Sequence, residues 1–163
     1  MELLSDADLK YYAKKLNIPL HAVLQKDLFS KFQIKKGAYI INLQNSTVGN
    51  GTHWTSLVIT DTHAVYYDSF GLSIPTPILK FIIKSKAKLK IIYSTDQLQV
   101  MDSIFCGWFA LYFIYFMTRL HPRCKDAKYL LNKHNAIYSV ENKYLNDSIL
   151  QKLIKKTFSN KLK

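Results

Sequence analysis

The spacing of apolar and polar residues in the first half of the chain predicts one helix followed by several strands. Ser5, with Asp8 three residues later, resembles a capping box, and the apolar positions after it fit a helix that ends near Asn17. Residues 21–32 are expected to hold a second, short helical segment. Runs of β-branched and aromatic residues predict the strands, which are placed at residues 38–43, 53–60, 64–70 and 88–94.

The rest of the chain is expected to be mostly helical. Residues 107–118 are almost continuously apolar, which predicts a buried helix, and residues 147–156 have the one-sided apolar pattern of a surface helix. Shorter helices are expected at residues 78–84 and 125–132, and an irregular segment at residues 96–105. The order of one helix, then strands, then helices indicates an α+β domain, and we expect a single domain over residues 1–163.

Composition favours a folded, soluble protein. Hydrophobic residues make up 48% of the 163 positions, with eleven Tyr and nine Phe, so a sizeable core is expected. The longest apolar run, residues 107–117, is too short to cross a bilayer, and the N-terminal residues do not resemble a secretory signal. We therefore expect an intracellular protein without membrane contact, whose two cysteines are reduced.

The positive charge of the chain is concentrated in its second half. Residues 1–82 carry 8 lysines and 6 acids, a net charge of +2, whereas residues 83–163 carry 15 basic residues and 5 acids, a net charge of +10. Such an asymmetry points to a polyanionic partner, most simply nucleic acid bound without sequence specificity. A lysine-rich solvated surface explains the same numbers, and both interpretations stay open.

Four residues have the chemistry of a cysteine acyl-transfer site. In chain order they are His53, Asp68, Gln99 and Cys106, which match a general base, its orienting acid, an oxyanion donor and a nucleophile. His53 begins one strand of a predicted hairpin and Asp68 ends the other. Because the turn centres near residues 61 and 62, residue 53 should lie opposite residue 69 or 70, within side-chain reach of Asp68. An aspartate there would fix the histidine tautomer.

The cysteine and the glutamine depend on the start of the apolar helix. Cys106 precedes Gly107, so it is expected at the helix N-terminus, where unpaired amides and the helix dipole favour a thiolate. Gln99 can direct its amide N–H toward a developing oxyanion, together with the backbone N–H of Cys106.

Each of these four residues also has an ordinary structural explanation. A cysteine before an apolar helix is usually a core residue. His53 could be structural, Asp68 could cap a turn at Gly71, and Gln99 could lie on the surface. The order and context of all four together favour the catalytic interpretation.

The motifs GTHW, YYDSFG and Q-x6-CG resemble those of the adenovirus-type (adenain-like) cysteine maturation proteases, including relatives from virophages and Polinton-like viruses. These belong to one group with the SUMO-deconjugating proteases. The resemblance is strongest over residues 37–117, and no motif is recognisable after about residue 122. The seven-residue step from Gln99 to Cys106 favours the viral branch.

The resemblance implies a papain-like, adenain-like α+β fold with a central mixed or antiparallel sheet and the nucleophile at the N-terminus of a buried helix. It implies His53 as base, Asp68 as orienter, Cys106 as nucleophile and Gln99 as oxyanion donor. Trp54, Gly51 and Gly107 are the expected substrate-binding residues. The sequence departs from the family at Phe105, where a small residue or Asn/Asp is usual. Gln97 fits the spacing of the oxyanion donor less well than Gln99.

The resemblance also implies a function, which we state as a hypothesis. The protein would cleave viral capsid and core precursor proteins at Gly-Gly or Gly-X sites. We expect it to act as a monomer that is not secreted, in the virion and in the host cytoplasm, nucleus or viral factory. No metal or cofactor is needed for the chemistry, although DNA or a peptide can act as activator in such proteases. The alternatives are a deconjugase of ubiquitin-like modifiers and an inactive, basic, DNA-binding virion protein.

Overall fold

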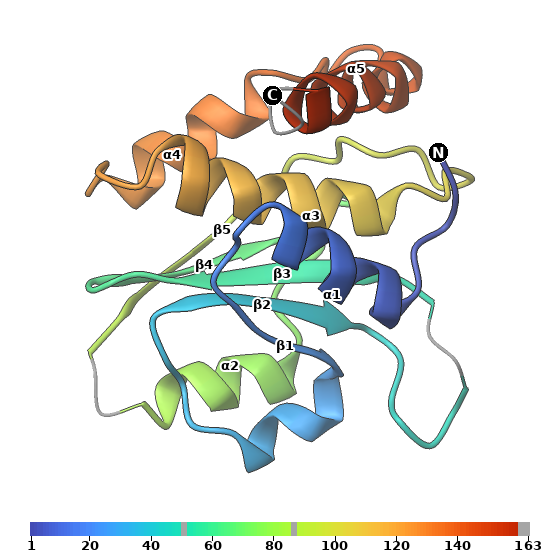
Figure 1. Ribbon diagram of the computed structural model, residues 1–163. Coiled ribbons are helices and arrows are strands. Elements are labelled where there is room, and N and C mark those ends of the chain that lie inside the picture. Colours follow the sequence, from blue (N-terminus) through green and yellow to red (C-terminus); the bar gives the residue numbers. More distant parts are fainter. Residues whose placement is uncertain (50–51, 86–87, 160–163) are drawn as a thin grey trace.

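The computed structural model describes residues 1–49, 52–85 and 88–159, which form a central sheet with helices on both faces (Figure 1). The sheet consists of β1 (Leu20–Gln25), β2 (Gly37–Asn42), β3 (Trp54–Ile59), β4 (His63–Tyr67) and β5 (Lys90–Tyr93), in this spatial order. The inner pairs β2–β3 and β3–β4 are antiparallel, and the outer pairs β1–β2 and β4–β5 are parallel. The sheet is therefore mixed, and the predicted α+β fold is confirmed.

The helices lie on the two faces of this sheet (Figure 1). One face is covered by α1 (Asp6–Lys15) and α3 (Cys106–Tyr115), with α4 (Ala127–Asn135) and α5 (Asn146–Ser159) beyond α3. The other face is covered by the 3₁₀ helix η1 (Lys26–Lys31) and α2 (Thr76–Ile83). A π-helical turn, η2 (Phe116–Leu120), continues α3, and a short 3₁₀ helix, η3 (Lys143–Leu145), precedes α5.

The central strands are apolar on both sides because both faces of the sheet are covered. In β2, Ala38 and Ile40 face the α3 side, whereas Tyr39 and Ile41 face the α2 side. The alternation of side chains along a strand divides the residues between two hydrophobic clusters. The sheet is thus a rigid, buried platform for the loops at its ends.

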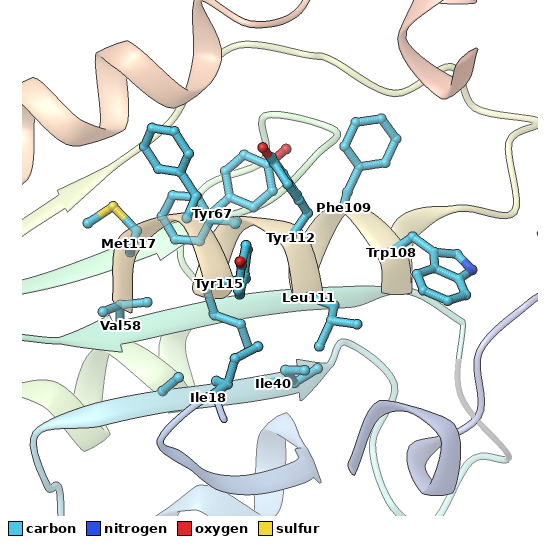
Figure 2. Close-up of a cluster of buried hydrophobic side chains, with 14 of the residues drawn as sticks. Ile18, Ile40, Val58, Tyr67, Trp108, Phe109, Leu111, Tyr112, Tyr115 and Met117 are labelled. Atoms are coloured by element: carbon cyan, nitrogen blue, oxygen red, sulfur yellow. The ribbon is translucent and has the colours of Figure 1, made fainter. Parts of the chain in front are cut away.

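The helix α3 is the centre of the larger cluster, and all of its residues from Cys106 to Tyr115 are buried. Figure 2 shows Leu111 of this helix directed toward Ile40 below it, with Phe109 and Tyr112 on the other side. The continuous apolar run in the sequence therefore reflects a helix surrounded by protein, as predicted.

The predicted helix at residues 21–32 is wrong over its first part. Leu20–Gln25 is the edge strand β1, in which Val23 pairs with Ile40, and only Lys26–Lys31 is helical, as a 3₁₀ turn. Pairing with β2 overrides the weak local preference of this segment. The helix predicted at residues 125–132 begins later, at Ala127, because the Asp126 side chain caps it by accepting from the N–H of Tyr129 at 2.9 Å.

None of the helices in the described ranges is long and apolar enough to cross a membrane.

A buried histidine in the larger cluster should make the protein sensitive to acid. His134 of α4 has no exposed surface and lies among the rings of Tyr67, Phe113 and Tyr138. Burial lowers the pKa of His134 to about 4, and the hydrogen bond with Asn135 opposes this only partly. The unfolded chain therefore takes up a proton below pH 6.5 while the folded chain does not.

We expect the free energy of unfolding to fall by up to about 1.4 kcal/mol per pH unit from pH 6.5 toward pH 4 because of this one group. Urea denaturation at pH 6.5, 6 and 5 measures the slope. His134→Phe should flatten it more than His121→Phe does, because burial lowers the pKa of the more exposed His121 less. Equal slopes for the wild type and His134→Phe would contradict the prediction.

Candidate active site

The hairpin of β3 and β4 brings His53 and Asp68 together. Ser56 pairs with Tyr67 in this hairpin, and the same register carried outward sets residue 53 opposite residue 70, as predicted. Nε2 of His53 lies 2.7 Å from Oδ1 of Asp68, and both side chains are buried. The pair follows from a short local turn and does not depend on any distant part of the chain.

The carboxylate of Asp68 is held by the backbone as well as by the histidine. Oδ1 accepts a second hydrogen bond from the N–H of Phe70 at 2.8 Å, and the backbone carbonyl of Asp68 accepts from Gly71. The turn-capping role considered for Asp68 is therefore real, and it coexists with the contact to His53. Within the described residues no donor reaches Oδ2 of Asp68. The imidazole of His53 is therefore the main group that stabilises the buried carboxylate.

Phe70 is a site residue that the sequence interpretation missed. Its ring stacks on the imidazole of His53, with ring centroids 4.2 Å apart and planes inclined by 16°. The hairpin register contained the signal, because it placed residue 69 or 70 opposite His53. The stacked ring restricts the imidazole to one plane.

Cys106 is the first residue of α3 and is buried. The N-cap position is occupied by Phe105, which has no side-chain cap hydrogen bond, so the first amides of the helix are not used by a capping oxygen. An apolar N-cap is unusual in a purely structural helix. It leaves the positive end of the helix dipole beside the sulfur, where an anion is stabilised.

The surroundings of His53 favour its protonated form. Burial of the ring lowers its pKa, but hydrogen bonds to Asp68 and to Cys106, with the charges of both, outweigh the burial and raise the pKa of His53 to about 9. Since Nε2 faces Asp68, Nδ1 is the nitrogen left for the thiol. At neutral pH the ring is an imidazolium, whose charge favours the thiolate form of Cys106.

Gln99 lies in the interior of the protein and has no exposed surface. The alternative interpretation, that Gln99 is an ordinary surface residue, is therefore wrong. Oε1 of Gln99 accepts from the Ser69 hydroxyl at 2.6 Å, and its Nε2 donates to the carbonyl of Ser103 at 2.8 Å. An amide nitrogen carries two hydrogens, and the bond to Ser103 uses one of them. The two partners fix which end of the amide points toward the loop before Cys106.

The chain after residue 122, which has no recognisable motif, holds this loop in place. Nδ2 of Asn135 in α4 donates to Oγ of Ser94 at 2.7 Å and to Oδ2 of Asp96 at 2.8 Å. Nζ of Lys143 donates to Oε1 of Gln97 at 3.0 Å. These contacts fix the first part of the segment that joins β5 to α3.

A second buried asparagine fixes the segment next to Gln99. Nδ2 of Asn146 donates to the carbonyls of Leu98 and Ser139, both at 2.8 Å, and its side chain has no exposed surface. Asp147 accepts from the Ser103 hydroxyl at 3.0 Å. Such long-range contacts leave no periodic pattern in the sequence, so sequence reasoning could not find them.

The predicted substrate residues Trp54 and Gly107 pack against the N-terminal segment. Nε1 of Trp54 donates to the carbonyl of Leu4 at 2.9 Å, and Nε1 of Trp108 to that of Glu2 at 2.8 Å. A Cβ on Gly107 would lie 3.1 Å from Cβ of Leu4 and 3.3 Å from Cδ1 of Trp54. Close packing therefore favours glycine here, since any larger residue would displace the side chains of Leu4 and Trp54.

The remaining sequence candidates lie apart from the site or outside the described residues. Gly51 lies outside them. Gln97 donates to the backbone of Gln99 at 3.3 Å and so supports that residue. Cys124 is exposed. No three His, Cys, Asp or Glu side chains in the described ranges are placed to hold a metal ion.

Two crystal structures of the ASFV pS273R protease are similar to this chain. The first has a TM-score of 0.52 and 18% sequence identity, and the match covers 75% of this chain and 58% of that one. The chain has a papain-like cysteine protease fold. The second crystal structure, of the selenomethionine protein, has a TM-score of 0.48 and 18% identity, over 79% of this chain and 64% of that one.

The SUMO protease Ulp1, with its catalytic cysteine oxidised to a sulfinic acid, gives a TM-score of 0.48 at 16% identity, over 93% of this chain and 78% of that one. No protein-family model and no curated protein matches the chain. The similarity is thus one of fold: a mixed five-stranded sheet with a buried cysteine at the start of α3. The chain spans less than two thirds of the pS273R structures.

Proposed function

We propose that the protein is a cysteine endopeptidase with Cys106 as nucleophile, His53 as general base and acid, Asp68 as its orienter and Gln99 as oxyanion donor. The observation that carries the proposal is the position of His53. Its Nε2 lies 2.7 Å from Oδ1 of the buried Asp68, and Cys106, at an uncapped helix N-terminus, contributes to the rise of its pKa. Buried groups with strongly perturbed pKa values and mutual hydrogen bonds are typical of catalytic sites.

The arrangement supports acyl transfer in two steps. The thiolate of Cys106 attacks the carbonyl carbon and a C–S bond forms, while the oxyanion is met by Nε2 of Gln99 and the backbone N–H of Cys106. The His53 imidazolium gives its proton to the leaving amine as the C–N bond breaks. The neutral imidazole then takes a proton from water, which attacks the thioester and releases the acid. Asp68 and Phe70 keep the ring oriented throughout.

For the substrate, we propose viral capsid and core precursor polypeptides cut at Gly-Gly or Gly-X sites, with nonspecific DNA as a second partner. The motif resemblance, the seven-residue step from Gln99 to Cys106 and the fold similarity to a viral protease support the first part. The net charge of +10 on residues 83–163 supports the second. Action in the virion or in the infected cell follows from the same proposal.

Alkylation of the two cysteines tests the catalytic site without a known substrate. With iodoacetamide at pH 7, Cys106 should react faster than Cys124, because the imidazolium of His53 favours the thiolate form of the neighbouring cysteine. His53→Ala should slow the alkylation of Cys106. Mass spectrometry of tryptic peptides measures the labelling of both cysteines, and the variant Cys106→Ser gives the labelling of Cys124 alone. Equal labelling of the two cysteines would exclude the proposed site.

A comparison of substrates tests the proposed specificity. A Gly-Gly capsid-type peptide should be cleaved faster than a SUMO-type fusion protein. Preferential cleavage of the fusion would favour the deconjugase instead. If Cys106 were reactive but neither substrate were cleaved, the proposed substrate class would be wrong and only the proposed nucleophile would be supported.

A further inference from the structure

Five large apolar side chains are exposed on two neighbouring segments beside the candidate site. Met101 and Tyr144 are the most exposed, at 74% and 78% of their surface. The others are Ile104 on the first segment and Val140 and Leu145 on the second. Scattered exposed apolar residues are normal, but a cluster on one surface is typical of a binding site.

The two segments enclose a groove with a volume of about 510 Å³. Met101 and Asp102 line one side, and Val140, Glu141 and Tyr144 line the other. Gln97, Val100 and Lys143 complete the lining. The groove and the exposed residues around it are called the 101/144 surface below.

The charge of this surface is opposite to that of its surroundings. Four of the five acids in residues 83–163 fall in residues 94–104 and 139–147, and these two segments contain a single basic residue, Lys143. Their net charge is −3, so the other residues of 83–163 carry +13. The groove itself is lined by Asp102, Glu141 and Lys143, a net charge of −1. Burial raises the pKa of Asp147, and the negative charge of Asp102 raises it further. Asp102 and Asp147 thus repel each other, and a cation placed near Asp102 would reduce this repulsion.

The 101/144 surface is continuous with the candidate active site. Gln97, which lines the groove, donates to the backbone of Gln99. Ser103 accepts from Gln99 through its carbonyl and donates to Asp147 through its hydroxyl. A chain bound in the groove therefore lies against the loop that carries Gln99 and leads to Cys106.

We propose that the 101/144 surface docks a segment of the polypeptide substrate in which apolar and basic side chains alternate. The apolar residues fit among Met101, Val140 and Tyr144, and the basic ones pair with Asp102 and Glu141. The inference rests on the proposed function and narrows its substrate class. A polyanion such as nucleic acid is attracted to the basic remainder of the chain but repelled here, so this surface stays free for the polypeptide.

Peptide binding to Cys106→Ala tests docking without any catalysis. Two fluorescein-labelled hexapeptides are compared by polarisation, one alternating leucine and lysine, the other leucine and glutamate. The overall charge of +12 favours the glutamate peptide. We expect the lysine peptide to bind at least about fivefold more tightly, because local complementarity decides. Tighter or equal binding of the glutamate peptide would overturn the proposal.

Matched variants locate the binding. Tyr144→Ala and the double variant Asp102→Asn, Glu141→Gln should each weaken the lysine peptide at least about fivefold. Tyr129→Ala and Asp61→Asn, at exposed positions elsewhere, should not. Equal losses in both sets would overturn the proposal. So would a concentration-dependent dimer that Tyr144→Ala disrupts, since the surface would then bind a second copy of the chain.

Chloroacetyl derivatives of the same peptides connect the surface to the thiol. In wild-type protein, attack by Cys106 forms an S–C bond and releases chloride. The alkylation rate of Cys106 with each peptide is divided by its rate with chloroacetamide. This relative rate should be at least about fivefold higher for the lysine peptide than for the glutamate peptide. Binding without this acceleration would overturn the role in substrate delivery. An unreactive Cys106 would overturn the proposed function while leaving the binding result intact, so the two failures are distinguishable.

Discussion

Asp68→Asn should slow peptide hydrolysis by about 10²- to 10⁴-fold with little change in the fold. The amide oxygen of asparagine can accept both hydrogen bonds now made to Oδ1, from His53 and from Phe70. The geometry is therefore retained, but the negative charge is lost. Burial lowers the pKa of His53, and the charge of Asp68 now offsets this effect. Without that charge the pKa of His53 falls, so fewer molecules carry the imidazolium that stabilises the Cys106 thiolate.

Initial rates with a fluorogenic Gly-Gly peptide measure the loss, and thermal unfolding monitors the fold. Alkylation of Cys106 should become slower at the same time, because a smaller fraction of His53 is protonated. Asp61→Asn is the matched control, because Asp61 forms an exposed ion pair with Lys36 on the hairpin turn. An Asp68→Asn protein with wild-type rates would remove Asp68 from the mechanism.

Gln99→Ala should lower the rate of acyl transfer by about 10²- to 10³-fold and leave iodoacetamide alkylation of Cys106 nearly unchanged. Only acyl transfer develops a negative charge on an oxygen. Alkylation displaces iodide and creates no oxyanion, so the two reactions separate an oxyanion donor from a residue that merely supports the thiol.

Gln33→Ala provides the comparison, since Gln33 is an exposed glutamine beside α2, away from Gln99 and from the 101/144 surface. It should change acyl transfer much less than Gln99→Ala. If Gln99→Ala slowed both reactions equally, the residue would act on the cysteine and not on the oxyanion.

The parts of the site that could be predicted from the sequence depend on short stretches of chain. Asp68 reaches His53 because a tight turn fixes the register of the hairpin, and Cys106 begins α3 because the apolar run begins there. Both follow from spacing alone. The same register also pointed to Phe70, so that omission was one of interpretation.

The rest depended on contacts between distant segments. β1 became a strand because β2 was available to pair with it, which the composition of residues 20–25 does not reveal. Asn146 reaches Leu98 across 48 residues, and its position in the sequence marks it only as the start of a helix. The interior position of Gln99 depends in the same way on Ser69, thirty residues earlier.

The order in which the chain is synthesised gives the contacts of Asn135, Asn146 and Asp147 a further importance. A nascent chain that extends to residue 122 already contains His53, Asp68, Gln99 and Cys106, but none of the three side chains that fix the loop from Ser94 to Ser103. The contacts that fix this loop can therefore form only after residues 135–147 have been synthesised.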